Sequence, residues 1–224
     1  MNHGHYDKSK LRLRRLLETG TYSSEQSEVI QESIEKGLED IEIKVYLNDR
    51  LSPDQMRRCM YGFTYGLQAI DVEKYAKECY SIKEMDQIRY ALMNESERNV
   101  VAYLLKGDFD ESQMLEIRKG NDLPDMYIQM YAMPYYTAEQ MKEIRLGFQH
   151  GLSLKHISCY CDARFSDCKM NMIRKGLEKG INTVQALEYA QPDISEDSLY
   201  HAIKAAEKTV RKRSHKKRGI ELSL

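Results

Sequence analysis

Tryptophan is absent from this 224-residue chain, proline occurs only four times, and glycine occurs only twelve times. Because proline and glycine are the residues that α-helices tolerate least, their scarcity favours a helix-rich chain. A hydrophobic content of 42% together with a mean hydropathy of −0.65 indicates a sizeable core under a polar surface. We therefore expect a soluble, folded protein.

Long apolar runs are also missing. No run approaches the roughly 18 apolar residues that a bilayer-spanning helix needs, and residues 1–10 lack the apolar stretch of a secretory signal. The five cysteines are an odd number in a chain too long to need disulfide staples. These features predict a cytoplasmic protein with reduced thiols and no disulfide.

The chain has no excess of one charge and no recognisable catalytic motif. Lysine plus arginine number 34 against 35 for aspartate plus glutamate, which argues against bulk nucleic-acid binding. A glycine-rich phosphate loop, an HExxH motif, a nucleophile elbow and a paired-cysteine motif are all absent from the sequence. We therefore predict that the protein is not an enzyme and carries no cofactor.

The sequence does contain an internal repeat. The phrase MxxIRxG occurs at residues 114–120, 141–147 and 170–176, with weaker forms upstream. We number each copy from the apolar residue five positions before the methionine. The copies then begin, at spacings of 29, 29, 29, 27, 29 and 29 residues, at Tyr22, Leu51, Tyr80, Phe109, Tyr136, Phe165 and Ile194. This constancy predicts six full copies and one partial copy.

Each copy carries start and stop signals for a helix of about 13 residues. Position two is a serine, threonine or aspartate in every copy, which is typical of a helix N-cap. A glutamine or glutamate three residues later completes a capping box in five copies. Position sixteen is glycine in four copies, which suits the left-handed residue that ends a helix; these are Gly37, Gly66, Gly151 and Gly180.

The second half of each copy predicts a shorter helix that ends near a tyrosine. Apolar residues at positions six, nine and thirteen give the first helix one apolar face, which the short helix alone cannot cover. Successive helix pairs must therefore stack. The sequence predicts an all-α protein: a tail and basic capping helix at 1–21, an α-solenoid of about six and a half two-helix repeats at 22–210, and a basic tail at 211–224.

Two further positions recur inside the first helix. Position twelve is Gly62, Gly120, Gly147 or Gly176, and a glycine inside a helix predicts close approach by a neighbouring backbone. Position ten is an arginine in four copies, which would form a ladder: Arg89, Arg118, Arg145 and Arg174. The heads of these side chains can bond acids or carbonyls of adjacent helices, and phosphate binding is the alternative.

The third and fourth copies depart most from the pattern. The third has Ala91 and Glu95 where others have glycine, and the fourth is two residues shorter and carries Pro124. A bend and a binding feature are both open. The basic segment near the C-terminus is either a solvated tail or a contact for nucleic acid or an acidic protein. Its basic residues are Arg211, Lys212, Arg213, Lys216, Lys217 and Arg218.

Two local clusters are candidate sites. An aromatic-rich stretch is either core or a protein-binding surface, and it contains Tyr127, Met130, Tyr131, Tyr135 and Tyr136. The weak metal-ligand candidates are His156, Cys159 and Cys161, but their spacing is not that of a zinc motif, and the cysteines occupy small buried positions of the repeat. We therefore predict no metal.

The phrases QMKEIRLGFQHGL and KMNMIRKGLEKGI, followed by segments that end in Tyr160 and Tyr189, resemble a repeat in short helical tandem-repeat proteins of Firmicutes mobile elements and prophages. The resemblance is good over residues 109–193 and loose over 22–108. It implies a mobile-element accessory protein without catalytic residues, and such elements often encode inhibitors of host defence, including anti-CRISPR proteins.

These features give two functional hypotheses. The first is a non-enzymatic protein-binding scaffold whose partner is a host defence nuclease or ribonucleoprotein, inhibited by the binding itself. The second is a nucleic-acid-binding repeat protein that uses the arginine ladder and the basic tail.

Overall fold

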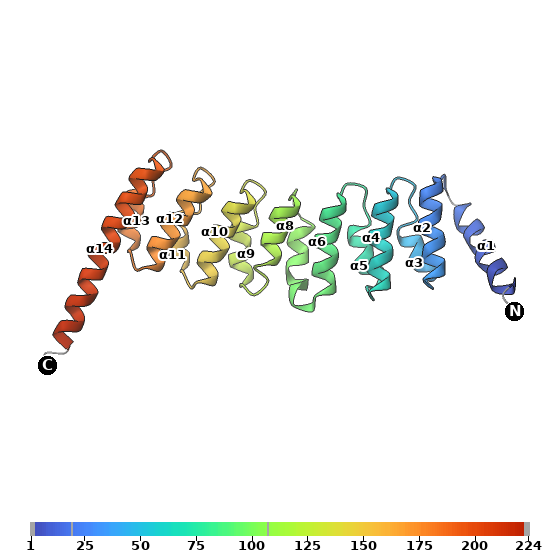
Figure 1. The fold of residues 1–224 in the computed structure, drawn as a ribbon, viewed down its shortest axis with the longest axis horizontal. Helices are drawn as coiled ribbons and strands as arrows, with labels where there is room; N and C mark the ends of the chain where they lie inside the picture. Colours follow the sequence, from blue (N-terminus) through green and yellow to red (C-terminus); the bar gives the residue numbers. More distant parts are fainter. Residues whose placement is uncertain (1–2, 19, 107, 222–224) are drawn as a thin grey trace. The chain divides into compact units, whose positions relative to one another are not determined.

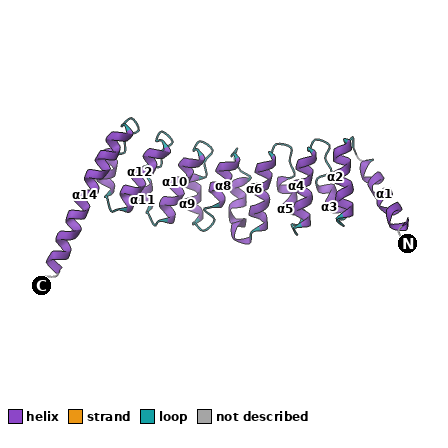
Figure 2. Ribbon diagram, in the orientation of Figure 1, coloured by secondary structure: helices purple, strands orange, loops and turns teal. Residues whose placement is uncertain are grey.

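The computed structural model describes the backbone of residues 3–18, 20–106 and 108–221. Every regular element in these residues is a helix, and none is a strand (Figure 2). The all-α prediction is confirmed. No helix in the described ranges combines the length and the apolar character that crossing a bilayer requires.

The chain divides into two compact units, unit 1 (Met1–Lys106) and unit 2 (Gly107–Leu224). The division falls at the end of the third copy of the repeat, two residues before the fourth copy begins at Phe109. The repeat region expected at 22–210 is therefore shared between two units.

Unit 1 consists of long helices that lie side by side and short segments that pack between them (Figure 1). Its elements are α1 (His3–Leu17), α2 (Ser24–Glu35), α3 (Asp40–Val45), α4 (Pro53–Thr64), α5 (Ala69–Tyr75), α6 (Ile82–Met93), the 3₁₀ helix η1 (Glu95–Val100) and α7 (Val101–Leu104). Helix α1 packs on α2, α2 on α4, and α4 on α6. The short helix α5 contacts α3, α4 and α6.

Unit 2 repeats this arrangement (Figure 1). Its elements are α8 (Glu111–Arg118), α9 (Asp125–Tyr131), α10 (Ala138–Gln149), α11 (Leu154–Ile157), α12 (Asp167–Glu178), α13 (Thr183–Tyr189) and α14 (Glu196–Glu221). The first helices α8, α10, α12 and α14 contact one another in sequence order. The short helices α11 and α13 each contact the long helix before and the long helix after them, whereas α9 packs on α10.

The predicted start and stop signals are confirmed. The side chains at position two accept a backbone hydrogen bond at the start of α2, α4, α6, α8, α10 and α12, and capping boxes are present in the first five. The glycines at position sixteen have φ values of 83° to 92°. At the first of them the amide of Leu38 bonds back to Ser33, and Leu38 is buried as an apolar lid.

The glycine at position twelve has a different reason from the one that the sequence suggests. A Cβ atom on Gly62 would lie 2.0 Å from the hydroxyl oxygen of Tyr75, the fully buried tyrosine of the same copy. The equivalent distances are 1.9 Å at Gly120 and 2.1 Å at Gly147. The neighbour is thus a tyrosine side chain, and the expected backbone contact is wrong for these three copies.

The first and third copies show a related pairing, whereas in the sixth copy the neighbours of an added Cβ on Gly176 are Ile181 and Ile203. In the first copy Ser33 replaces the glycine and accepts a 2.7 Å hydrogen bond from Tyr46. In the third copy alanine, Ala91, takes the glycine position and leucine, Leu104, takes the tyrosine position, and both are buried. The third copy also lacks a regular short helix, because η1 and a four-residue α7 take its place.

Both ends of the described chain are helical, and the basic helix expected over 1–21 is present as α1. The N-terminal helix α1 begins at His3, buries Leu16, and bonds through Arg12 to Asp40 and to the carbonyl oxygen of Leu38. At the other end α14 is continuous to Glu221, so the backbone from residue 211 is helical rather than a separate tail. Four of its predicted contact residues lie outside the described side chains: Arg213, Lys216, Lys217 and Arg218.

Candidate functional site

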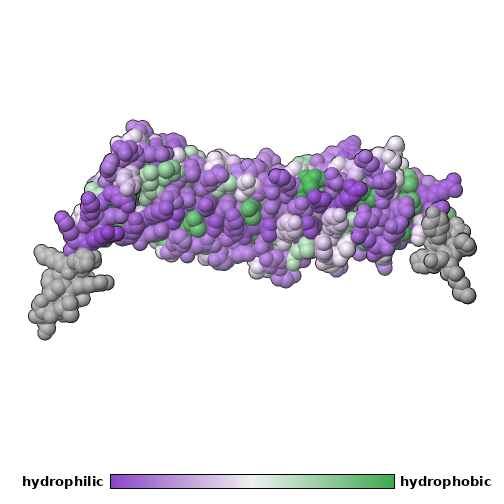
Figure 3. All heavy atoms as spheres, viewed as in Figure 1, coloured by the Kyte–Doolittle hydropathy of each residue, from purple (hydrophilic) through white to green (hydrophobic). Residues whose placement is uncertain are grey.

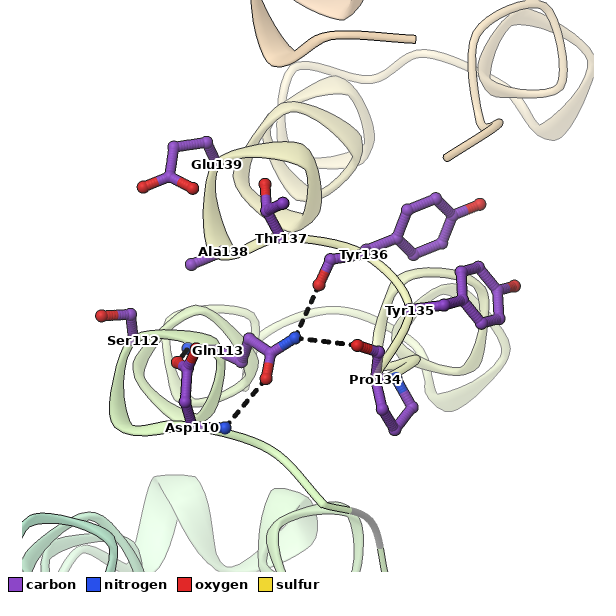
Figure 4. A pocket seen from close by; sticks show the side chains of 9 residues that line it. All are labelled: Asp110, Ser112, Gln113, Pro134, Tyr135, Tyr136, Thr137, Ala138 and Glu139. Carbon is purple, nitrogen blue, oxygen red and sulfur yellow. Dashed lines mark hydrogen bonds between the residues drawn. The ribbon is translucent and has the colours of Figure 1, made fainter. Parts of the chain in front are cut away.

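The glutamine of the capping box joins neighbouring copies as well as capping its own helix. In Figure 4 the amide nitrogen of Gln113 donates to the carbonyl oxygens of Pro134 and Tyr136, at 3.1 and 2.6 Å, while its oxygen accepts from the Asp110 amide. The same pair of bonds recurs at Gln26, Gln55 and Gln140. We call this arrangement the glutamine joint.

The hollow around the Gln113 joint has a volume of about 320 Å³ (Figure 4). Its polar centre is already satisfied, because Gln113 uses both its amide nitrogen and its oxygen within the chain. Tyr135, at the edge, points away from Gln113 and is 64% exposed. The hollow is therefore best explained as a structural joint rather than a ligand site.

The arginine ladder in unit 2 is paired with buried glutamates of the preceding copy. Arg145 donates to Glu116 from Nε at 3.1 Å and from Nη2 at 2.7 Å. Arg174 donates from Nε to Glu143 at 2.8 Å. All four side chains are buried, so the interpretation of the ladder as a contact between helices accounts for these two arginines. Arg118 is half-buried.

Arg89 in unit 1 lacks the corresponding partner. The preceding copy carries Arg58 at position eight, where Glu116 and Glu143 stand in unit 2. Arg89 is 6% exposed and donates from Nη2 to Asp86, but its buried Nε has no hydrogen-bond acceptor. It is the one buried side-chain nitrogen or oxygen without a partner in the described ranges. Leaving a buried donor unsatisfied costs about 1–3 kcal/mol, and more when the group is charged.

Around Arg89 the surface between α4 and α6 forms a depression of about 390 Å³, which we call the tyrosine hollow. It is lined by Arg58, Tyr61, Tyr65, Asp86, Arg89, Tyr90 and Met93. Tyr65, Tyr90 and Met93 are exposed, and the guanidinium of Arg89 lies 4.6 Å from the centre of the Tyr90 ring. Tyrosine, arginine and methionine are the residues enriched in protein interfaces.

Sequence reasoning missed the tyrosine hollow, although the repeat contains a signal for it. Position eleven is tyrosine in the second and third copies only, at Tyr61 and Tyr90. The other full copies carry Glu32, Lys119, Leu146 and Lys175 there. Two neighbouring copies that share an aromatic residue at an outward position identify a surface feature that helix stacking does not need.

A second surface feature recurs on the short helices. Their second residue is apolar and exposed in four copies: Ile41 is 68% exposed, Ile70 68%, Met126 53% and Val184 65%. Single exposed apolar residues are common, and Figure 3 shows scattered apolar groups on a mainly hydrophilic face. Recurrence at one repeat position is not explained by chance scatter or by core packing. We call these four residues the exposed apolar series.

The aromatic-rich stretch is divided between core and surface, and its two buried tyrosines are not available as a binding surface. Tyr131 is fully buried and Tyr136 is 4% exposed, because both occupy repeat positions that face the helix stack. Tyr127 stacks on Phe148 with ring centres 4.2 Å apart, and Met130 is half-buried. Of the five predicted residues, only Tyr135 is exposed.

The weak metal-ligand candidates have other contacts. His156 Nδ1 lies 2.9 Å from the Ser153 hydroxyl, and Cys161 Sγ lies 3.2 Å from the Tyr136 hydroxyl. Cys159 is buried, and burial raises the pKa of both thiols. Within the described part of the chain, no group of three or more histidine, cysteine, aspartate or glutamate residues is arranged to hold a metal ion.

Basic side chains gather on the terminal helices. Helix α1 exposes Lys8, Lys10, Arg14 and Arg15, and α14 exposes Arg211 and Lys212. The nucleic-acid hypothesis for these residues stays a prediction.

Comparisons with known proteins found no match among family models, curated proteins or solved structures.

Proposed function

We propose that the protein is a non-enzymatic protein-binding scaffold, and that its copies form an α-solenoid of about six and a half two-helix repeats. Support for the solenoid comes from the contacts within each unit. The long helices contact their neighbours in sequence order, and glutamine joints link successive copies at a constant register. Helical repeats of this kind present extended surfaces to partners.

The observation that carries the binding proposal is the exposed apolar series. Full burial of an isoleucine side chain stabilises by about 1.5–3 kcal/mol, and Ile41 and Ile70, each 68% exposed, leave most of that contribution to a partner. Ile41 and Ile70 occupy the same position on α3 and α5, which contact each other, so the two offer adjacent anchors in unit 1.

The resemblance to repeat proteins of mobile elements extends the proposal to the kind of partner. We propose a host defence nuclease or ribonucleoprotein, inhibited because the scaffold occupies a surface that it needs. No catalytic residue of the scaffold takes part in this activity.

The test is affinity capture from the native host with paired variants. The wild-type chain is compared with Ile41→Glu/Ile70→Glu, and the control Lys44→Glu/Glu73→Lys alters exposed residues on the same two helices. We expect a protein that the wild type and the control retain and that the isoleucine variant loses by about tenfold or more. Equal retention by all three would refute the role of the exposed apolar series.

A salt titration of the captured complex separates the nucleic-acid hypothesis. A complex dominated by phosphate contacts loses affinity steeply with the logarithm of salt concentration. Deletion of residues 211–224 should weaken such a complex and leave a complex held by Ile41 and Ile70 unchanged.

A further inference from the structure

The repeat supplies an internal reference for Arg89. Two arginines at the same position, Arg145 and Arg174, each use Nε to bind a carboxylate of the preceding copy. In the second copy that carboxylate is replaced by Arg58, so the Nε of Arg89 is buried without an acceptor. The carboxylate that accepts from Arg145 and from Arg174 in unit 2 therefore has no counterpart at Arg89.

Charge at the tyrosine hollow matches an acidic ligand. Asp86 accepts from Arg58 Nε at 3.2 Å and from Arg89 Nη2 at 2.8 Å, so one carboxylate serves two guanidinium groups. The hollow therefore carries one uncompensated positive charge. Charged hydrogen bonds between guanidinium and carboxylate groups are among the strong polar contacts in proteins.

The remaining lining favours a protein segment as the carrier of that carboxylate. Tyr65, Tyr90 and Met93 are exposed at the rim, where they can cover an apolar side chain next to the acid. Large aromatic residues combined with arginine are the usual anchors of protein interfaces.

We propose that the tyrosine hollow binds an acidic segment of a partner protein, with a glutamate or aspartate carboxylate accepting hydrogen bonds from Arg58 and from Arg89 Nε. This proposal rests on the proposed scaffold function and names the chemistry of one partner site. Arg89 Nε is covered in the present arrangement, and the same guanidinium contacts the Tyr90 ring and, through Nη1, the Met93 sulfur, so binding requires these side chains to shift. A carboxylate is favoured over a phosphate because Glu116 and Glu143 fill the equivalent place in unit 2.

The probe is a fluorescein-labelled peptide, EELEEYEE, compared with its counterpart QQLQQYQQ by fluorescence anisotropy on the full chain. We expect the acidic peptide to bind at least about tenfold more tightly than the glutamine peptide. Arg58→Glu is the decisive variant, because it restores the carboxylate found in unit 2 and lets Arg89 pair within the chain. We expect this variant to lose the peptide by about tenfold or more and to unfold at a higher urea concentration.

The matched control is Arg57→Glu, which makes the same charge change on the neighbouring residue. Arg57 pairs with Asp54 and does not line the hollow, so this variant should retain wild-type affinity. Equal binding of both peptides, or unchanged binding by Arg58→Glu, would overturn the proposal. Stronger binding of a labelled oligothymidylate that Arg58→Glu abolishes would also overturn it, by assigning the site to phosphate.

The two proposals fail separately. If a captured partner depends on Ile41 and Ile70 but not on Arg58, the scaffold stands and the acidic-segment site is wrong. If the acidic peptide binds through Arg58 while capture is insensitive to the isoleucines, the hollow stands and the role of the exposed apolar series is wrong.

Discussion

Units 1 and 2 use the same helical architecture but complete their buried polar contacts to different degrees. In unit 2 each contact between neighbouring long helices from α8 to α14 contains a buried acid paired with a cation: Glu116 with Arg145, Glu143 with Arg174, and Glu207 with Lys179. In unit 1, Arg58 and Arg89 share one aspartate. Both units still stack their helices, so the paired acid is not required for the fold. Where the paired acid is absent, as at Arg58 and Arg89, the arginines are available for contacts with a partner.

The largest loss of stability should come from removing the buried acid of a helix contact in unit 2, so that it resembles the contact between Arg58 and Arg89 in unit 1. Glu116→Ala leaves the buried guanidinium of Arg145 without its carboxylate and should lower the free energy of unfolding by about 3 kcal/mol. Urea unfolding measures the loss, and hydrogen exchange with mass spectrometry should locate it in unit 2. The control Glu139→Ala removes an exposed acid and should cost only a few tenths of a kcal/mol. A loss spread evenly over both units would contradict the assignment.

A smaller loss should follow from crowding the tyrosine in unit 1. Gly62→Ala places a methyl group against the hydroxyl of Tyr75 and should cost about 2 kcal/mol in urea unfolding. Gly62→Ala/Tyr75→Leu copies the Ala91 and Leu104 pair of the third copy and should recover part of that loss.

Gly176→Ala in unit 2 is the matched comparison for this crowding. An added Cβ there lies 3.0 Å from Ile181 rather than about 2 Å from a tyrosine hydroxyl, so the cost should be smaller. A Gly62→Ala variant as stable as Gly176→Ala would show that the tyrosine contact does not determine the glycine.

The glutamine joint should have an effect of about 1–2 kcal/mol. Gln140→Glu keeps an oxygen for the capping box but removes the amide that donates to Ala163 and Phe165. Gln140→Lys should be milder, because Lys169 already donates to the carbonyl oxygen of Pro192 at 2.7 Å. Thermal unfolding of the two variants checks this order, and a glutamate variant as stable as the lysine variant would argue against a donor role.

The smallest effect is the contribution of Glu178 to the pH dependence of folding stability. Burial alone would raise the pKa of Glu178, but hydrogen bonds from His150 and Arg174 hold it below its usual value. A depressed folded-state pKa contributes stability above the unfolded pKa of about 4.3, and this is lost as pH falls through the folded value. The contribution should be under about 1 kcal/mol for this partly exposed group. Urea midpoints measured below pH 5 should fall less for Glu178→Gln than for the wild type.

Unit 1 has a comparable carboxyl in Asp71. Burial would raise its pKa, but hydrogen bonds from Lys74 and Arg98 lower it. Asp71→Asn should therefore reduce the acid sensitivity of unit 1 in the same pH range, as measured by hydrogen exchange, and should leave unit 2 unchanged. Equal acid sensitivity in the variant and the wild type would contradict this.

Local signals in the sequence predicted the helices well. N-caps, capping boxes and left-handed glycines depend on neighbours within a few residues, so their pattern placed the helix starts correctly. The expected length of about 13 residues holds approximately, except that α8 ends at Arg118 after eight residues. Contacts between copies were harder to predict from the sequence. Gln26 reaches carbonyl groups 23 and 25 residues ahead, and no spacing rule identifies a backbone acceptor at that distance.

The tyrosine hollow was still harder to predict from the sequence. The lining of the tyrosine hollow comes from α4 and α6, two helices one copy apart, and becomes visible only when they lie side by side. The relation between glycine and tyrosine was accessible from the sequence, because Ala91 and Leu104 change together in the third copy. The sequence alone does not separate core from surface for Tyr131 and Tyr136, since tyrosine serves in both places and only their burial in the structure decides.

The glutamine joint bears on how such a chain can grow. Its donor lies at position five of one copy, and its acceptors are main-chain carbonyl groups at the end of that copy and the start of the next. Main-chain acceptors exist whatever the side chain, so duplicating or deleting a whole 29-residue segment that carries the glutamine keeps this joint intact. Glu84, at the same position in the third copy, cannot donate such a bond. Copies can therefore be added or removed more freely before and after the third copy than at the junction that the third copy makes with the next one.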